Sequence, residues 1–375
     1  MTLTIRRLVW IASILAFFPI FVGPTLAQQT RPAVELKTFD LGDFPLESGK
    51  ILKGAKLVYT TRGTLNAAKT NAILLPSPYS GNHTSYDFLI GPGRAIDPAK
   101  DFIIATNQLG NGVSSSPSNT PDPQHGPDFP AIAIRDDVEA TYRLVTKGLG
   151  IDRLHAVVGF SMGGQQAMQW AVSHPDMMLG VVNLCGSARE YPFGFVRLEG
   201  AKGAILGDPT FASGRYTTPP VGGLKALGAH WVAWAYSPEW WRDGEYKKGG
   251  ATIEQTVEGW KSGFLDQDAN NLLLQAVKWQ KHDVATTPGM NGDLARALGS
   301  IKAKVLLMPS RTDQYFLAAD VEAEGKLIPG SKLDVIPSTY GHTAGGGGDR
   351  AMNPTLNRKI GEFLGSLNGE VGAGK

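Results

Sequence analysis

Short apolar runs separated by turn-forming residues recur along the chain and form its most regular pattern. Each run has four or five nearly continuous apolar residues, which is typical of strands buried on both faces of a parallel sheet. The runs are residues 72–75, 102–105, 154–158, 181–185, 305–308 and 333–336.

Helical patterns lie between several of these runs. Residues 136–147 place Val138, Tyr142 and Val145 at helical spacing, and residues 165–173 read as a second helix. The alternation of strands and helices predicts an α/β fold with a mostly parallel sheet and helices on both faces. Ligands of such sheets bind beyond the carboxyl ends of the strands.

The alternation breaks between residues 190 and 298, where a mostly helical insertion is predicted. Six of the eight tryptophans fall there: Trp231, Trp234, Trp240, Trp241, Trp260 and Trp279. They form either the core of the insertion or, for one or two of them, the lining of a pocket. The chain is therefore predicted to have an α/β core of residues 28–189 and 299–375, with residues 190–298 as a lid.

The N-terminus has the pattern of an export signal. Arg6 and Arg7 precede an apolar run over residues 8–22, and small residues end at Ala27. The run is short for a membrane span, and Pro19 interrupts it. We expect residues 1–27 to be a cleaved signal peptide of a periplasmic or secreted protein without a stable membrane span. An uncleaved membrane anchor is the alternative.

Composition is that of a globular protein with a large core, at 42% hydrophobic and 19% charged over 375 residues. The chain has 36 basic and 34 acidic residues, and removal of residues 1–27 takes away two arginines and no acid. The mature chain is then formally neutral, which gives no reason to expect nucleic acid or an anionic membrane as a partner.

Cys185 is the only cysteine, so no intrachain disulfide can form. Its position in an apolar run predicts a buried strand thiol. Two stretches are expected to be flexible by composition: the four glycines of residues 345–348 and the C-terminal residues 369–375.

Residues 159–163, Gly-Phe-Ser-Met-Gly, have the form G-x-S-x-G between an expected strand and an expected helix. This context is that of a nucleophile elbow, in which Gly159 and Gly163 leave room for a strained turn. The start of the following helix adds backbone N–H donors and a positive dipole end. The pattern predicts that Ser161 is a nucleophile.

A serine needs a base, which a third group must orient, and in this fold the chain order is serine, acid, histidine. Four histidines follow the serine: His174, His230, His282 and His342. The first ends the helix after the elbow, and the next two fall in the insertion. His342 follows the last expected strand and is the predicted general base.

Asp313 is the predicted acid because it follows the expected strand at residues 305–308. Asp320 and Glu322 are nearby alternatives on an expected helix.

The oxyanion hole requires one N–H from the residue after the nucleophile, Met162, and one from the loop after an early strand. That loop begins after residue 75, and its Pro76 and Pro78 have no N–H to donate. Tyr79 is the predicted second donor, with Ser80 behind it.

Other chemistries find little support in the sequence. It contains no H-E-x-x-H, no C-x-x-C, no phosphate-binding G-x-x-x-x-G-K-[ST] and no dinucleotide fingerprint. Neither a metal nor a nucleotide cofactor is indicated. The expected partner is a small-molecule ester substrate, and the sequence leaves a homodimer open.

Several segments together resemble the homoserine O-acetyltransferase family of α/β-hydrolase-fold enzymes, and they span nearly all of the chain after residue 27. The segments are residues 59–67, 90–97, 107–110, 128–130, 166–171, 207–209, 214–216, 312–316 and 340–342, together with the elbow. The resemblance implies the α/β-hydrolase fold, Ser161 as nucleophile with Asp313 and His342 as its partners, and a helical lid over an acyl pocket.

The chain departs from the family pattern around the expected pocket. Residues 77–81 read Ser-Pro-Tyr-Ser-Gly where the family has His-Ala-Leu-Thr-Gly, and residues 110–117 replace a Gly- and Thr-rich segment. After His342 the family continues with an acidic and then bulky apolar residues, whereas this chain has Thr343, Ala344 and four glycines.

These departures and the export signal favour an exported serine esterase, because acetyl-CoA is an intracellular metabolite. A transferase must also keep water away from its acyl-enzyme, which requires a closed acceptor site. The alternative is an acyltransferase that passes an acyl group from acyl-CoA to a small alcohol. A non-catalytic binding protein on a hydrolase scaffold is a third interpretation.

Overall fold

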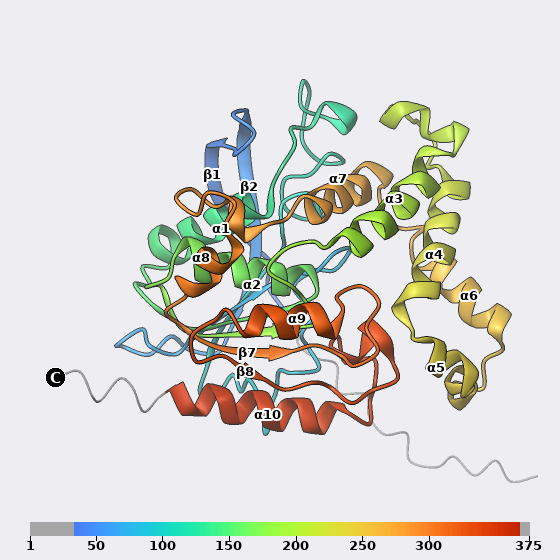
Figure 1. Cartoon of the computed structure of the whole chain (residues 1–375). Coiled ribbons are helices and arrows are strands. Elements are labelled where there is room, and N and C mark those ends of the chain that lie inside the picture. The colour runs from blue at the N-terminus through green and yellow to red at the C-terminus, as the bar shows by residue number, and fades with distance from the viewer. Residues whose placement is uncertain (1–33, 368–375) are drawn as a thin grey trace, which may run out of the picture. The chain divides into compact units, whose positions relative to one another are not determined.

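The computed structural model describes residues 34–367, which contain an eight-stranded sheet with helices on both faces (Figure 1). The strand order is β1-β2-β4-β3-β5-β6-β7-β8. The pairs β1–β2 and β2–β4 are antiparallel, and all the other pairs are parallel. The predicted fold class, an α/β fold with a mostly parallel sheet between helices, is therefore confirmed.

The strands are β1 (Lys37–Pro45), β2 (Ile51–Arg62), β3 (Ala72–Pro76), β4 (Phe102–Thr106), β5 (Leu154–Phe160), β6 (Met178–Leu184), β7 (Lys304–Met308) and β8 (Lys332–Leu333). The helices are α1 (Ile134–Arg143), α2 (Met162–Ser173), α3 (Pro192–Leu206), α4 (Val221–Ala235), α5 (Pro238–Arg242), α6 (Ile253–Ser262), α7 (Ala269–Gln280), α8 (Leu294–Gly299), α9 (Ala318–Gly325) and α10 (Asn353–Ser366).

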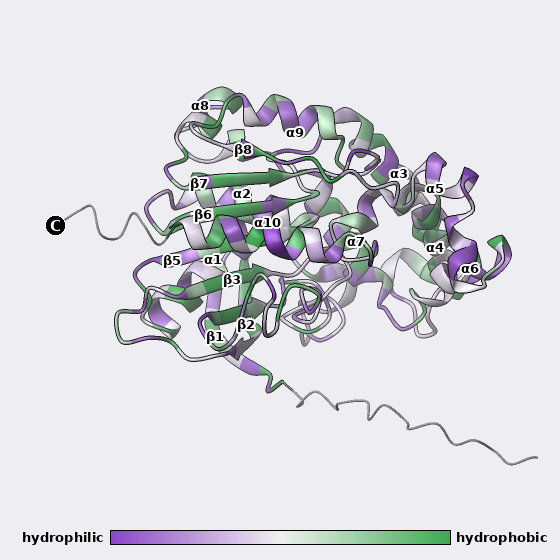
Figure 2. Ribbon diagram, turned by 90° about the horizontal axis from the view of Figure 1, so that it is seen from below, coloured by the Kyte–Doolittle hydropathy of each residue, from purple (hydrophilic) through white to green (hydrophobic). Residues whose placement is uncertain are grey.

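Two hydrophobic layers form because alternate residues of each buried strand point to opposite faces of the sheet. Leu74 packs on one face with residues of α1, α2, α8 and α9. Ile73 and Leu75 pack on the other face with Leu356 and Ile360 of α10. Figure 2 shows the hydrophobic central strands with α10 crossing in front of them. This double coverage explains the continuous apolar runs in the sequence.

The sheet differs from the prediction at its two edges. Strands β1 and β2 were not predicted, because their residues are largely exposed or half-buried and show no continuous apolar run. The strand predicted at residues 333–336 is wrong in extent, since β8 covers only Lys332–Leu333 and is exposed. An isolated bridge joins Ile336 to Ser310 beyond it. The helix predicted at 136–147 is α1 followed by a π-helical segment, Leu144–Gly148.

Residues 190–298 contain helices and no strand, and most of their buried hydrophobic side chains form one cluster, which also includes Ile134, Met162, Tyr315 and Phe316. An isolated bridge joins Arg189, directly before this segment, to Asp283 within it, and the two side chains also form an ion pair of 2.8 Å. Val284 and Leu298 pack into the main core instead. Movement of the segment as a lid stays a prediction.

The predicted signal peptide, residues 1–27, and the C-terminal stretch 369–375 lie outside the described residues. Between residues 34 and 367 no helix has both the length and the apolar character needed to cross a membrane.

A buried ion pair fastens α7 of the insertion to the core. Lys278 Nζ lies 2.5 Å from Asp137 Oδ2 of α1 and donates to the carbonyl of Leu109 at 2.9 Å. The other oxygen of Asp137 accepts the N–H of Leu109 at 2.8 Å. Burial raises the pKa of Asp137 and lowers that of Lys278, and each charge offsets this effect on the other. One pair thus joins α7, α1 and the loop after β4.

We expect Lys278→Met to lower the free energy of unfolding by about 3–5 kcal/mol, because it leaves the buried Asp137 carboxylate without its cation. Urea titration followed by tryptophan fluorescence measures this change. The matched control is Lys302→Met, which removes an ion pair with Asp176 whose side chains are 62% and 77% exposed. An equally small effect of both substitutions would contradict the anchoring role.

Glu324 on α9 is another buried acid, and no Lys, Arg or His of residues 34–367 forms an ion pair with it. Its carboxylate accepts the N–H of Ala188 at 2.9 Å and the hydroxyl of Tyr191 at 3.1 Å. Burial raises its pKa from 4.5 to about 8. The folded protein therefore takes up a proton at this site at a pH where the unfolded chain does not.

The stability that this proton contributes is complete below pH 4.5 and is lost as pH rises towards about 8. We expect Tm to fall less between pH 5 and pH 8 in Glu324→Gln than in the wild type, as measured by calorimetry. Glu322→Gln is the control, because Glu322 is an exposed residue of the same helix paired with Lys326. Parallel curves for wild type and Glu324→Gln would refute the assignment.

Candidate active site

Ser161 lies in the tight turn between β5 and α2, with φ of 58° and ψ of −127°. The turn is possible only because two glycines allow close approach of the backbone. A Cβ on Gly159 would lie 2.0 Å from the carbonyl oxygen of Gly163, and a Cβ on Gly163 would lie 2.4 Å from that of Pro76. The predicted strained elbow is confirmed.

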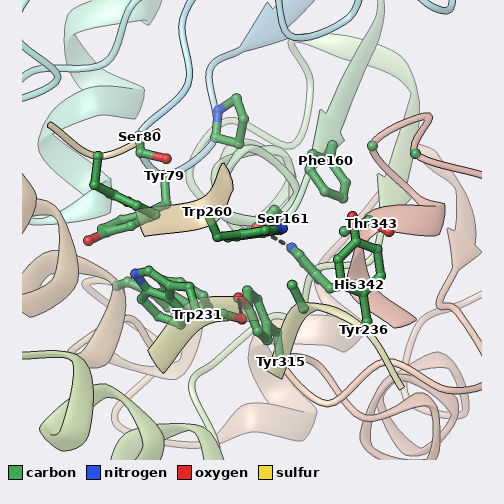
Figure 3. Close-up of a pocket in the computed structure, with 16 residues that line it drawn as sticks. Tyr79, Ser80, Phe160, Ser161, Trp231, Tyr236, Trp260, Tyr315, His342 and Thr343 are labelled. Atoms are coloured by element: carbon green, nitrogen blue, oxygen red, sulfur yellow. Dashed lines mark hydrogen bonds between the residues drawn. The ribbon is translucent and has the colours of Figure 1, made fainter. Parts of the chain in front are cut away.

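The three residues predicted to act together are in contact. His342 Nε2 lies 2.8 Å from Ser161 Oγ (Figure 3). On the other side of the ring, His342 Nδ1 lies 2.8 Å from Asp313 Oδ2. The other oxygen of Asp313 accepts the backbone N–H groups of Tyr315 and Phe316 at 2.7 and 3.2 Å. The histidine thus pairs with Asp313, and the alternatives on α9 are not its partners.

Two aromatic rings hold the imidazole from either side. The ring of Tyr315 stacks on His342 with centroids 4.3 Å apart, and that of Phe160 does so at 4.9 Å. Phe160 immediately precedes Ser161, so the nucleophile and the packing of its base are fixed by one strand end. The geometry suits proton transfer between Ser161 Oγ and His342 Nε2.

The glycines of residues 345–348 are packed, which corrects the expectation of a flexible loop. A Cβ on Gly345 would lie 2.5 Å from Cys185 Sγ, and one on Gly346 would lie 2.8 Å from the Phe160 ring. Backbone N–H groups of the run donate to carbonyls of residues 342–344. Cys185 is buried as predicted, but it lies one residue beyond β6 with φ of 47°.

Two backbone N–H groups beside the serine are available to a ligand. Met162 is the first residue of α2, so its N–H has no acceptor within the helix. The N–H of Tyr79 has no acceptor among residues 34–367. Ser80 does not serve as a spare donor, because its N–H donates to Gln275 Oε1 at 2.9 Å.

Tyr86 connects the elbow to the loop that contains Tyr79, and no sequence pattern predicted this contact. Its hydroxyl donates to the carbonyl of Pro76 at 2.6 Å and accepts the N–H of Phe160 at 2.9 Å. The side chain is fully buried. Tyr86 lies in a turn-rich segment, where no local sequence pattern predicts hydrogen bonds to Pro76 and Phe160.

A cavity of about 320 Å³ opens at Ser161 and His342. The insertion supplies much of its wall, including Trp231 and Trp260 (Figure 3) and also Trp279. Three tryptophans of the insertion therefore line the pocket, more than the one or two allowed for. The sixteen lining residues include no Lys, Arg, Asp or Glu, and eight of them are aromatic besides His342.

Residues 81–346 match the family described as alpha/beta hydrolase fold. The chain belongs to this family. An ethyl acetate hydrolase of Pseudomonas veronii is 41% identical over 87% of this chain and 95% of that protein. A homoserine O-acetyltransferase of Nostoc punctiforme is 30% identical over 80% of this chain and 89% of its own length, which confirms the resemblance found in the sequence.

Comparison with solved structures also finds an esterase of the same fold. The acetyl esterase MekB superimposes on this α/β hydrolase with a TM-score of 0.86 at 40% identity, over 88% of this chain and 97% of that one.

Behind the aromatic wall of the pocket this α/β hydrolase buries an arginine and a glutamic acid side by side, and no sequence pattern predicted them. The guanidinium of Arg197 lies 4.4 Å from the Tyr315 ring centroid and 4.7 Å from that of Trp279. The carboxyl of Glu190 lies 3.8 Å from Arg197 and accepts the indole N–H of Trp279 at 2.6 Å. Burial raises the pKa of Glu190 to about 8. The Arg197 cation and the Glu190 carboxyl support the aromatic wall from behind, and neither residue lines the cavity.

Tyr86→Phe is expected to lower the free energy of unfolding by about 1–3 kcal/mol, because it leaves a buried carbonyl and a buried N–H without partners. Chemical denaturation measures the loss. Tyr142→Phe serves as the control, since the Tyr142 hydroxyl bonds to none of the described residues and its ring stacks on His174. If both variants unfold at the same denaturant concentration as the wild type, the Tyr86 hydroxyl does not stabilise the elbow.

Proposed function

We propose that this α/β hydrolase is a serine esterase that cleaves a carboxylic ester through an acyl-enzyme on Ser161. The observation that carries the proposal is the contact of His342 with both Ser161 and Asp313, each at 2.8 Å. Asp313 as carboxylate accepts the Nδ1 proton of His342, which leaves the Nε2 lone pair to accept the serine proton. The serine oxygen can then attack an ester carbonyl carbon.

This attack places a negative charge on the carbonyl oxygen of the ester, and hydrogen-bond donors beside Ser161 must stabilise it. The N–H groups of Tyr79 and Met162 are the two available, and the positive end of the α2 dipole adds to them. His342 then gives its proton to the departing alkoxide, which leaves as an alcohol. In the second half, His342 takes a proton from water as the water oxygen attacks the acyl carbon. The bond to Ser161 Oγ then breaks, His342 returns the proton to that oxygen, and the free acid leaves.

The chemistry of the pocket favours water as acceptor over a charged amino acid. A zwitterion such as homoserine would lose hydration in this cavity without a counter-charge among the lining residues. An uncharged ester with a small apolar acyl group suits the aromatic wall. The names of two similar proteins, ethyl acetate hydrolase and acetyl esterase MekB, support the same substrate class.

A second candidate function is acyl transfer from acyl-CoA to a small alcohol. It is favoured by the 30% identity to a homoserine O-acetyltransferase over 80% of the chain. Both functions share the acyl-enzyme on Ser161 and differ in the molecule that removes the acyl group.

Export to the periplasm or the medium is part of the proposal and is supported by the signal-like pattern of residues 1–27. Cell fractionation, with mass spectrometry of the mature N-terminus, tests it. A mature chain that still begins at Met1 in the cytoplasmic fraction would contradict export.

The function itself is tested by incubating the wild type with p-nitrophenyl esters from acetate to octanoate, with and without homoserine, and analysing the products by mass spectrometry. We expect free acid in amounts that homoserine does not change. Ser161→Ala is expected to lower kcat by roughly 10⁴-fold or more, because the nucleophile is lost.

Ser173→Ala, at the other end of the same helix, controls for nonspecific effects of the substitution. Accumulation of acylated homoserine in place of acid would establish the transferase instead. Failure of a fluorophosphonate to label Ser161 in folded protein would refute both functions.

A further inference from the structure

Three buried glutamines hold the loop that carries Tyr79. Residues 76–81 have few backbone hydrogen bonds of their own, because Pro76 and Pro78 lack an N–H. Side chains supply the missing partners: Gln108 after β4, Gln166 of α2 and Gln275 of α7, each 1% exposed. Glutamine side chains can bond both carbonyl and N–H groups, so they replace the absent backbone ladder.

Gln108 contacts the peptide unit that carries the oxyanion donor. Its Nε2 donates to the carbonyl of Pro78 at 2.7 Å, and the N–H of Gly81 donates to the same oxygen at 3.1 Å. The Pro78 carbonyl and the Tyr79 N–H belong to one planar trans peptide, so they point in opposite directions. Fixing the carbonyl therefore fixes the direction of the N–H.

The neighbouring peptide units are held less directly. Gln108 Nε2 and Gln166 Nε2 donate to the carbonyl of Ser77 at 3.2 and 2.9 Å. On the other side, Gln275 Oε1 accepts the N–H of Ser80, whose φ of 54° is costly for a residue with a Cβ. Gln275 belongs to the helix that Lys278 fastens to the core, so the insertion helps to shape the donor loop.

We propose that Gln108 is a positioning residue that aims the N–H of Tyr79 at the developing oxyanion. The inference rests on the proposed esterase function and adds to it a residue that lies outside the cavity lining. Gln108 acts through the Pro78–Tyr79 peptide, and Gln275 supports the following unit. Loss of the Gln108 side chain leaves Ser161, His342 and Asp313 in place. It changes the direction of the Tyr79 N–H, which is one of the two oxyanion donors.

The test compares Gln108→Met, of similar volume but without a donor, with the wild type and with Gln169→Met on p-nitrophenyl acetate. Gln169 is a matched control, because it is also 1% exposed but bonds Ser173 and Thr287 instead of the loop. We expect kcat to fall about 10- to 100-fold in Gln108→Met while KM stays within about twofold, since removal of a whole donor costs about 10²–10³.

A merely structural role would not reproduce two further readouts. A trifluoromethyl ketone, which forms a tetrahedral adduct with an active serine, is expected to bind Gln108→Met more weakly by the same factor as kcat/KM falls. The acidic limb of the pH–kcat profile is expected to stay in place, because the pair of His342 and Asp313 is untouched. Gln169→Met is expected to match the wild type in both.

Unchanged kcat in folded Gln108→Met, or a fall no larger than in Gln169→Met, would overturn the inference while the active wild type upholds the esterase. A wild type that releases no acid would overturn the proposed function, and the inference with it. If Gln108→Met does not fold, Gln108→Asn decides, because its amide is one methylene short of the Pro78 carbonyl. A lower kcat at constant KM in this variant supports the inference, and an unchanged kcat refutes it.

Discussion

The backbone of Ser161 is the constraint on which the rest of the site depends. Its φ of 58° and ψ of −127° are unfavourable for a residue with a side chain, at a cost of about 1–3 kcal/mol. The surroundings hold it there: its N–H donates to the carbonyl of Leu184 at 2.8 Å, and its carbonyl accepts the N–H of Gln165 at 3.1 Å as α2 begins. The same turn lifts the hydroxyl towards His342 and ends β5 at the start of a helix. The nucleophile Ser161, the oxyanion donor Met162 and the positive end of the α2 dipole therefore all lie at this one strained turn.

Charge is distributed in a consistent way around this turn. The cavity is lined by aromatic and small residues, and two buried ion pairs lie behind it or beside it: Arg197 with Glu190, and Lys278 with Asp137. Lys278 and Asp137 fix α7 of the insertion against α1 of the core. Arg197 and Glu190 both belong to the insertion, and they pack behind the rings of Tyr315 and Trp279. Because the pocket itself is apolar, the hydrogen bonds between Asp313, His342 and Ser161 act in surroundings of low dielectric, where they are stronger than in water.

The sequence predicted the parts of the molecule that depend on local patterns. Strands β3 to β7 are buried on both faces and appear as apolar runs in the sequence. Ser161 is identified by the two flanking glycines, which lie between a strand and a helix. His342 and Asp313 follow from chain order. The rest depends on contacts between distant residues: Gln275 bonds Ser80 across 195 positions, and Tyr86 meets Phe160 across 74. The glycine run was misjudged because composition does not tell which side chains will press against it.

The anchoring of α7 limits how the insertion can be exchanged between related enzymes. Arg189 and Asp283 form a bridge where the chain leaves and rejoins the core. These two positions therefore look convenient as the ends of a segment to be exchanged. Yet α7 lies inside those points and carries Lys278 and Gln275, whose partners belong to the core. An exchange of the whole segment between these positions would have to leave the α7 of the recipient enzyme in place. Otherwise the recipient would need an acid at the position of Asp137 on α1 and a Tyr79 loop that fits the new α7. Substrate range in such chimeras is therefore best altered by replacing α4 to α6 alone.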